Sequence, residues 1–325
     1  MDMRTLGRVD IEVSPVGFGC WAIGGPFAHP TREPLGWGEV DDEESIRAVR
    51  RAVELGVTFF DTADVYGAGH SERVLGQALA GIRDQVVIAT KWGNTFDEST
   101  RTMYDKDSSV EYVHKAVRAS LDRLGTDYID LYQLHFDTTA DVALPLREAC
   151  EDLVREGLIR SYAWSTDTPS SAELFSEGEH CAAVQHELSV LHDAPEMLEL
   201  CERADLASIN RTPLGMGILG RRDTTRPATG ADIRTLPPSW LRFFDKGGVP
   251  APEWWDKVSA IRDVLQSDGR TLAQGALAWI WARSPRTVPI PGFRTVAQAE
   301  ENAAAMAHGP LSAEQMAEIA KLLDD

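Results

Sequence analysis

The sequence is short of positive charge and has no long apolar run. Its 325 residues carry a formal net charge of −19 at pH 7. A chain this acidic repels the phosphates of nucleic acids and the anionic headgroups of membranes, so we expect neither as a partner. No stretch holds the roughly 18 consecutive apolar residues of a membrane span, and the opening segment MDMRTLGRVDIEVSP lacks the apolar core of a secretion signal. These absences predict a cytoplasmic protein.

Cysteine is also scarce, with four residues at Cys20, Cys150, Cys181 and Cys201. None of them forms the closely spaced pairs that bind metals or carry redox chemistry. We therefore expect reduced thiols, with neither a disulfide framework nor a metal site.

Short apolar or β-branched runs alternate with longer helical patterns through most of the chain. The segments 41–56 and 108–125 place apolar residues at helical spacing, and each ends at a glycine. Eight strand–helix units in this alternation predict an α/β fold, a (β/α)8 TIM barrel that spans residues 1–325 as a single domain. The expected strands are Val16–Gly19, Thr58–Phe60, Val86–Thr90, Ile129–Leu134, Ile159–Trp164, Ala183–Gln185, Leu206–Ile209 and Val288–Ile290.

Segments outside this alternation are expected at the two ends of the barrel. An N-terminal β-hairpin, Arg4–Leu6 with Ile11–Val13, would cap the bottom. Three long irregular segments follow strands, namely Ala28–Val40, Gly93–Asp107 and Arg221–Pro252. They should therefore lie on the C-terminal face, where barrel enzymes hold their active sites.

Ionisable side chains follow three consecutive predicted strands. Asp61 ends the second strand and Tyr66 follows in a loop, Lys91 ends the third strand, and His135 ends the fourth. A single charged residue at a strand end is most often a solvated or salt-bridged rim residue. Four such groups on adjacent strands of one barrel instead indicate a catalytic site.

This set of residues suits proton transfer to an oxygen. A free tyrosine has a pKa of about 10 and donates its proton poorly at neutral pH. We expect the ammonium of Lys91 to lower the pKa of Tyr66, with Asp61 holding that ammonium in place. His135 could then hydrogen-bond a carbonyl oxygen or relay a proton.

Four segments of the sequence resemble the aldo-keto reductase superfamily, and the resemblance extends along essentially the whole chain. They are GVTFFDTADVYG, VVIATKWG, YIDLYQLH and TVPIPGFRTVAQAEEN. The resemblance implies an NADPH-dependent reductase of a small aldehyde or ketone, with NADH as a weaker alternative. It also implies that Tyr66 is the general acid, that Lys91 and Asp61 tune it, and that His135 orients the substrate carbonyl.

Two glycine patterns, GFGCWA and GMGILG, match the dinucleotide-binding motif of Rossmann folds, but neither is followed by a helical sequence. We therefore reject a Rossmann domain. The resemblance instead places these segments along the cofactor, from the nicotinamide ribose to the pyrophosphate. The residues implied are Gly19, Cys20, Trp21, Asp61, Thr212, Pro213, Leu214, Gly215 and Gly217.

The resemblance also implies contacts with both ends of the cofactor. Ser165 and Gln185 would hold the nicotinamide carboxamide, with Thr166 where the family often has asparagine. Arg211 stands where relatives place a stacking aromatic ring, and its simpler interpretation is a rim salt bridge. At the adenosine end the implied residues are Gly292, Arg294, Thr295, Gln298, Glu301 and Asn302, with Arg294 suited to a ribose 2′-phosphate. Glu301 can also be read as an ordinary solvated helix carboxylate.

Two other functions are weighed against reduction. Lys91 could form a Schiff base, as in aldolases of this fold, or the barrel could bind NADPH as a sensor subunit with slow turnover. The sequence is compatible with either a monomer or a homo-oligomer. Aromatic candidates for the substrate site favour an apolar or aromatic carbonyl compound or a sugar, and they are Trp21, Phe27, Trp37, Trp92, Phe136, Trp240, Phe243 and Phe244.

Overall fold

Eight parallel strands form the central sheet of the computed structural model, which describes residues 1–220, 228 and 230–324. The first and last strands meet through a single bridge between Gly19 and Gly292, so the sheet is a nearly closed barrel. The predicted (β/α)8 barrel is confirmed. Its strands are β3 (Gly17–Gly19), β4 (Phe59–Asp61), β5 (Val87–Trp92), β8 (Ile129–Leu134), β9 (Ile159–Ser165), β10 (Cys181–Glu187), β11 (Ala207–Arg211) and β14 (Thr287–Pro289).

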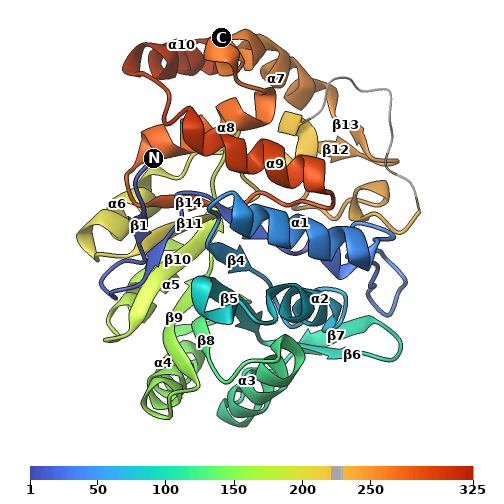
Figure 1. The fold of residues 1–325 in the computed structure, drawn as a ribbon, viewed down its shortest axis with the longest axis vertical. Helices are drawn as coiled ribbons and strands as arrows, with labels where there is room; N and C mark the ends of the chain where they lie inside the picture. The colour runs from blue at the N-terminus through green and yellow to red at the C-terminus, as the bar shows by residue number, and fades with distance from the viewer. Residues whose placement is uncertain (221–227, 229, 325) are drawn as a thin grey trace.

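Helices surround this sheet (Figure 1). Their ends follow local rules: Ser109 caps the start of α3 by accepting a hydrogen bond from the Tyr112 amide, and Gly125 ends it in the left-handed conformation. The helices are α1 (Asp42–Glu54), α2 (His70–Leu79), α3 (Val110–Leu124), α4 (Ala140–Arg155), α5 (Pro169–Ser176), α6 (Pro195–Arg203), α7 (Pro252–Leu265), α8 (Leu272–Arg283), α9 (Val296–Ala304) and α10 (Ala313–Asp324).

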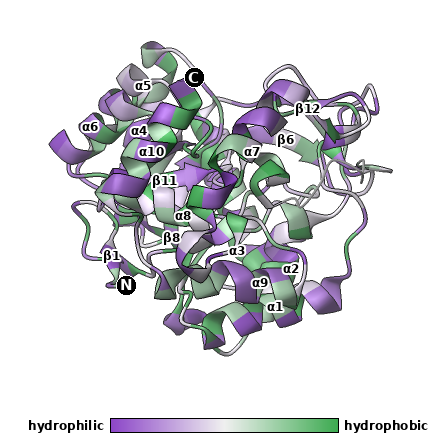
Figure 2. Ribbon diagram, turned by 90° about the horizontal axis from the view of Figure 1, so that it is seen from above, coloured by the Kyte–Doolittle hydropathy of each residue, from purple (hydrophilic) through white to green (hydrophobic). Residues whose placement is uncertain are grey.

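One flank of the barrel brings together helices that are far apart in the sequence. Figure 2 shows α1, α2 and α9 side by side, and α1 contacts both of the others. Residues facing the sheet, such as Ala48 and Val49 of α1, are fully buried, while charged residues cover the outer face. Among the described residues, no helix is both long and apolar enough to cross a membrane.

The N-terminal hairpin closes the bottom of the barrel as predicted. Its strands are β1 (Arg4–Thr5) and β2 (Glu12–Val13). Leu6 and Val13 are fully buried and join a cluster of inward-facing apolar side chains that includes Phe59, Val87 and Leu131. The lower half of the barrel is therefore a packed apolar plug, and function must lie at the other end.

The loops at the opposite end are more ordered than the sequence indicated. Instead of an irregular loop, 93–107 contains an antiparallel hairpin of β6 (Asn94–Asp97) and β7 (Thr102–Lys106). The carboxylate of Asp97 stabilises its turn by accepting hydrogen bonds from Ser99 and from the Thr100 amide.

The third segment, predicted from Arg221 to Pro252, lies partly outside the described residues. Its described part contains a second hairpin, β12 (Phe244–Asp245) with β13 (Val249–Pro250). It also contacts the first loop, because Ile233 donates a backbone hydrogen bond to Gly36 at 2.7 Å. The first and third loops thus meet at the C-terminal end of the barrel.

Candidate active site

A polar layer lies directly above the apolar plug of the barrel. Side chains alternate along a strand, so residues two positions after an inward-facing residue also face inward. Phe59, Ala89 and Leu131 belong to the plug. Asp61, Lys91 and Gln133 follow them at this spacing and converge at the C-terminal strand ends.

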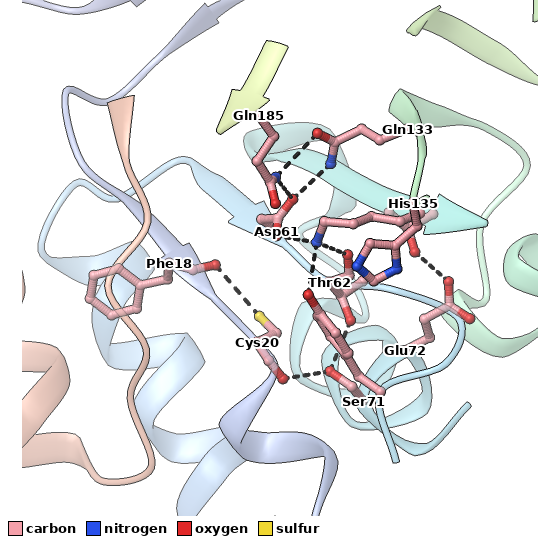
Figure 3. A network of polar contacts seen from close by, with 12 residues as sticks. Phe18, Cys20, Asp61, Thr62, Ser71, Glu72, Gln133, His135 and Gln185 are labelled. Carbon is pink, nitrogen blue, oxygen red and sulfur yellow. Dashed lines mark hydrogen bonds and ion pairs between the residues drawn. The ribbon is translucent and has the colours of Figure 1, made fainter. Parts of the chain in front are cut away.

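Asp61 is the centre of this layer (Figure 3). Its carboxylate is almost fully buried, with 3% of the side chain exposed. One oxygen accepts a hydrogen bond from Lys91 Nζ at 2.5 Å, and the other accepts one from each of the Gln133 and Gln185 amides at 2.8 Å. A buried carboxylate is costly unless it is paired in this way, so these three donors offset the cost of burying Asp61 and fix its position.

Lys91 connects Asp61 to the phenol. Its fully buried ammonium donates to Asp61, to the main-chain oxygen of Thr62 at 2.8 Å and to the Tyr66 hydroxyl at 3.2 Å. Burial lowers the pKa of this ammonium, but the negative charge of Asp61 and the contact with Tyr66 outweigh burial and raise the pKa above its ordinary value. Lys91 is therefore a permanent cation beside the phenol.

Tyr66 sits on a tight loop that only glycine allows. Gly67 has a positive φ of 63°, and a Cβ there would lie 1.9 Å from the main-chain oxygen of Gly24. The phenol ring stacks on Trp21 with centroids 5.7 Å apart and planes 20° from parallel. The loop and the indole together fix the direction of the hydroxyl.

Lys91 lowers the pKa of Tyr66 as predicted, but the net shift of this pKa is upward. Burial raises the pKa of Tyr66 above 10, and the opposing effect of Lys91 only partly offsets it. Desolvation wins because the hydroxyl lies in the same enclosed layer as Asp61, whose negative charge adds to the increase. The resting phenol is therefore protonated, as a proton donor must be.

His135 faces the phenol ring edge-on, with ring centroids 5.7 Å apart. The amide nitrogen of Asn94, on the β6–β7 hairpin, lies 3.4 Å from its Nδ1. Burial, followed by the positive charges of Lys91, Arg211 and Lys106, holds the pKa of His135 well below its ordinary value. The imidazole is therefore neutral and can donate one hydrogen bond from Nε2 when Asn94 donates to Nδ1.

The sequence interpretation missed Gln133 and a second buried network behind the site. Gln133 was detectable as the only amide in the apolar strand IDLYQL, two residues before His135. The second network joins Glu72 to Thr90 and to Arg123, each at 2.6 Å, and it has no short sequence signature. Thr90 precedes Lys91, so this network supports the strand end that carries the lysine.

The three residues predicted to hold the carboxamide differ in their contacts. Gln185 has its amide nitrogen committed to Asp61 and, at 3.1 Å, to Gln133. Thr166 is buried and its hydroxyl donates to Asp137 at 2.6 Å. Ser165 has no hydrogen-bond partner for its hydroxyl among the described residues, so it is the member best able to meet a ligand.

Arg211 ion-pairs with Asp167, so the rim salt bridge expected as its simpler interpretation is present. The next stretch, Thr212 to Gly217, has positive φ angles at Thr212, Gly215, Met216 and Gly217. The hydroxyl of Thr212 is buried without a hydrogen-bond partner among the described residues. Unusual backbone conformations and an unsatisfied buried hydroxyl are features expected where main chain approaches a ligand closely.

Of the three predicted cofactor contacts in the GFGCWA segment, Gly19, Cys20 and Trp21, the last has the side chain that faces outward. Gly19 is held by a backbone bond to Pro291, and Cys20 is fully buried. The Cys20 main chain is occupied by Asp61 and by the Ser71 hydroxyl, each at 2.7 Å. No long helix follows this segment, because only the short turn Ala22–Gly24 does, which agrees with the rejection of a Rossmann motif.

The predicted adenosine-end residues cluster at the start of α9. Arg294 donates from its guanidinium to the main-chain oxygens of Trp37 and Glu39, at 2.9 and 2.7 Å. Gln298 accepts from the Arg294 amide, and Thr295 caps the helix by accepting from the Gln298 amide. The guanidinium has five N–H groups, so these two bonds leave donors for a phosphate.

Two further predicted residues occupy the same helix. Asn302 is buried and donates to the main-chain oxygen of Gly292 at 3.3 Å, which shapes the strand end. Glu301 is half-buried, and its carboxylate has no partner among the described residues. Both therefore lie in the cluster that the resemblance implied.

The predicted aromatic residues differ in burial. Trp92, Phe136, Phe243 and Phe244 are buried in the main core, whereas Phe27 is buried in a small cluster against which Trp21 and Tyr66 pack. Burying the apolar surface of these rings stabilises the protein more than leaving them at a solvent-exposed rim would. Trp21 stacks on Tyr66 and is itself flanked by two indole rings. The ring of Trp37 meets Trp21 edge-on with centroids 5.7 Å apart, and Trp240, which is 52% exposed, has its ring centroid 6.4 Å from that of Trp21.

Residues 15–324 match the model of the Aldo/keto reductase family. The chain belongs to this family. It is 31% identical to an NADH-specific methylglyoxal reductase of Escherichia coli, with 93% of this chain and 92% of that protein covered.

Solved structures of the family have the same fold. An aldo-keto reductase from Bacillus halodurans in its holo form superimposes with a TM-score of 0.78 at 31% identity, covering 99% of this chain and 96% of the other. An aldo/keto reductase from Klebsiella pneumoniae in complex with NADP and acetate gives a TM-score of 0.70 at 27% identity, with the same coverage. Family membership supports an oxidoreductase acting on carbonyl compounds.

Proposed function

We propose that the protein reduces an aldehyde or ketone to an alcohol with NADPH, and that Tyr66 is the general acid. The observation that carries this proposal is the contact of a single buried ammonium, Lys91 Nζ, with both Asp61 and Tyr66. A cation at this point stabilises the phenolate left after proton transfer, and the carboxylate keeps the cation charged.

When bound, the cofactor supplies the hydride that the carbonyl carbon accepts. The remaining work falls to side chains of the protein. The substrate oxygen would lie between the Tyr66 hydroxyl and Nε2 of neutral His135. His135 would donate a hydrogen bond that orients the oxygen, and Tyr66 would transfer its proton as negative charge develops there.

The residues of the chain fit a nicotinamide dinucleotide. The partly exposed hydroxyl of Ser165, the buried unpaired hydroxyl of Thr212 and the left-handed backbone at Gly215 and Gly217 offer contacts to its nicotinamide and pyrophosphate parts. Arg294 would receive the ribose 2′-phosphate. The complex of the Klebsiella pneumoniae relative with NADP supports NADPH, and the NADH-specific Escherichia coli relative supports NADH as a weaker alternative.

The substrate would be an apolar or aromatic carbonyl compound, or a sugar stacked on a ring. Trp21 and the exposed Trp240 are the side chains that favour it, because indole rings bind such groups at little entropic cost.

The four cysteines are all unpaired, which supports the expected cytoplasmic location.

The Schiff-base alternative is weakened by the environment of Lys91. A nucleophilic lysine needs a lowered pKa, whereas the pKa of Lys91 is raised by its ion pair with Asp61. Borohydride in the presence of a carbonyl compound would trap a covalent adduct on Lys91 only if this alternative were correct.

A panel of aldehydes and ketones, followed through the loss of NADPH absorbance, tests the proposal. We expect turnover of at least one apolar or aromatic member, and its loss in Tyr66→Phe. NADPH binding without turnover of any member would overturn the proposal in favour of the sensor alternative.

A further inference from the structure

An acidic side chain from another helix occupies the start of α9. Glu44, on α1, accepts a hydrogen bond from the main-chain amide of Val296 at 2.9 Å. Its second carboxylate oxygen accepts one from Arg47 at 2.7 Å. These residues are separated by about 250 positions in the sequence, and the neighbouring packing of α1 and α9 brings them together (Figure 2).

Three main-chain amides at this helix start are satisfied by side chains of the protein. The Gln298 amide donates to Thr295, the Arg294 amide donates to the side chain of Gln298, and the Val296 amide donates to Glu44. A helix N-terminus attracts anions through such amides, so Glu44 takes the place that a second anion would use.

Glu44 is ionised under ordinary conditions. The hydrogen bond from Val296 and then that from Arg47 lower its pKa. Both positively and negatively charged side chains surround Glu44. Arg47 is 57% exposed and partly neutralises Glu44, while Asp41 caps the start of α1 and faces the same corner. Arg294 lies two residues before Val296 in the sequence, and its guanidinium adds a positive charge.

We propose that Glu44 is a specificity-determining residue for the dinucleotide, because its carboxylate opposes the ribose 2′-phosphate that Arg294 attracts. This inference rests on the proposed function, which places the adenosine ribose at Arg294. Glu44 thereby keeps the preference for NADPH over NADH small. A dinucleotide without the 2′-phosphate is unaffected, because its ribose hydroxyl carries no charge.

The test is Glu44→Gln, which removes the charge and retains an oxygen that can accept from Val296. Titration of intrinsic tryptophan fluorescence gives the dissociation constants of NADPH and NADH. We expect NADPH to bind about three- to tenfold more tightly and NADH to change by less than about twofold, since exposed charges interact weakly through water. Glu44→Ala removes both the charge and the contact with Val296, so the affinity for NADPH relative to NADH should rise as it does in Glu44→Gln, together with any change common to both cofactors.

Glu43→Gln is the matched control. It removes the same charge from the adjacent position of α1, where the side chain is 90% exposed, and no hydrogen bond or ion pair joins Glu43 to α9 in the described part of the chain. An equal gain of NADPH affinity in this control would show that only net charge matters and would overturn the inference.

A fragment of the cofactor separates this inference from the proposed function. Adenosine 2′,5′-bisphosphate should bind more tightly to Glu44→Gln than to the parent protein, and adenosine 5′-monophosphate should not. If both cofactors bind the parent protein and neither the ratio of their constants nor the bisphosphate affinity changes in Glu44→Gln, the inference is wrong and the reductase proposal stands. If neither cofactor binds the parent protein, the proposed function itself fails.

Discussion

The ammonium of Lys91 lies 3.2 Å from the hydroxyl of Tyr66 and 2.5 Å from the carboxylate of Asp61. The cation is thus shared between the carboxylate of Asp61 and a hydroxyl that becomes an anion only after it has lost its proton. In the resting protein the pKa of Tyr66 is nevertheless raised, because burial outweighs the cation. Lys91 therefore acts mainly on the product of proton transfer.

Tyr66→Phe should lower kcat for carbonyl reduction by at least about 10²- to 10⁴-fold, which is the usual contribution of acid–base catalysis. The phenylalanine ring can still stack on Trp21, so NADPH affinity should be nearly unchanged. Steady-state kinetics and fluorescence titration measure the two effects separately. A variant with more than about a tenth of the parent kcat would show that another group donates the proton.

Lys91→Met should reduce kcat comparably and move the alkaline limb of the pH–rate profile to higher pH. Reduction needs the protonated phenol, so activity falls as pH rises through the pKa of Tyr66. The ammonium lowers this pKa, and its removal should raise the pKa further. Asp61→Asn should lower kcat more mildly, and its alkaline limb should move to lower pH, because the Asp61 carboxylate raises the pKa of Tyr66. Superimposable profiles for parent and Lys91→Met would contradict the coupling.

Gln133→Leu should lower the free energy of unfolding by about 1.5–3 kcal/mol, because it removes one hydrogen bond to a buried charged group. Urea denaturation measures this loss. The same substitution should cost less in an Asp61→Asn background, where the accepting oxygen no longer carries a full charge. Equal costs in both backgrounds would show that Gln133 contributes through packing and not through Asp61.

Arg294→Ala should weaken NADPH binding about ten- to a hundredfold, as expected for a charge-assisted bond to phosphate, and weaken NADH binding much less. The same guanidinium also ties down Trp37 and Glu39, so some loss of stability is expected as well. Titration of both cofactors and a thermal melt of the free protein separate these roles. If binding of the two cofactors were weakened equally, Arg294 would have only a structural role.

Acid should destabilise the protein through buried His186. This ring contacts Ser208 at 2.7 Å and the main chain of Glu187, and burial lowers its pKa from 6.5 to about 4. The unfolded chain binds the proton first, so the stability that the neutral ring contributes is complete above pH 6.5 and declines as pH falls toward 4. The free energy of unfolding should fall by about 3 kcal/mol across this pH range. His186→Gln should flatten the dependence measured by denaturation at several pH values. An unchanged slope would assign the acid sensitivity to other groups.

Strand and helix identities were predictable because the two periodicities are strong in this chain. All eight expected barrel strands overlap the observed ones. The convergence of Asp61, Lys91 and His135 was predictable for a related reason: each lies at the C-terminal end of an apolar strand, and parallel strands end on one rim. Alternation along the same strands would also have revealed Gln133.

Features that depend on long-range packing were not predictable. The sign of the Tyr66 pKa shift follows from the balance between burial and one nearby cation, which residue order does not encode. The hairpin at 93–107 has strands of only four and five residues, too short for a clear alternation. The contact of Glu44 with Val296 joins distant parts of the chain, and no local pattern marks it.

The burial of every cysteine makes this chain a convenient background for site-specific chemistry. Burial raises the pKa of the Cys181 and Cys201 thiols to about 12, and that of Cys20 and Cys150 is raised as well, so few thiolates exist at neutral pH. Maleimide reagents react with thiolates that they can reach. A cysteine introduced at an exposed position, such as Trp240 near the aromatic rings, would therefore carry a spectroscopic probe alone, with the four native cysteines left in place.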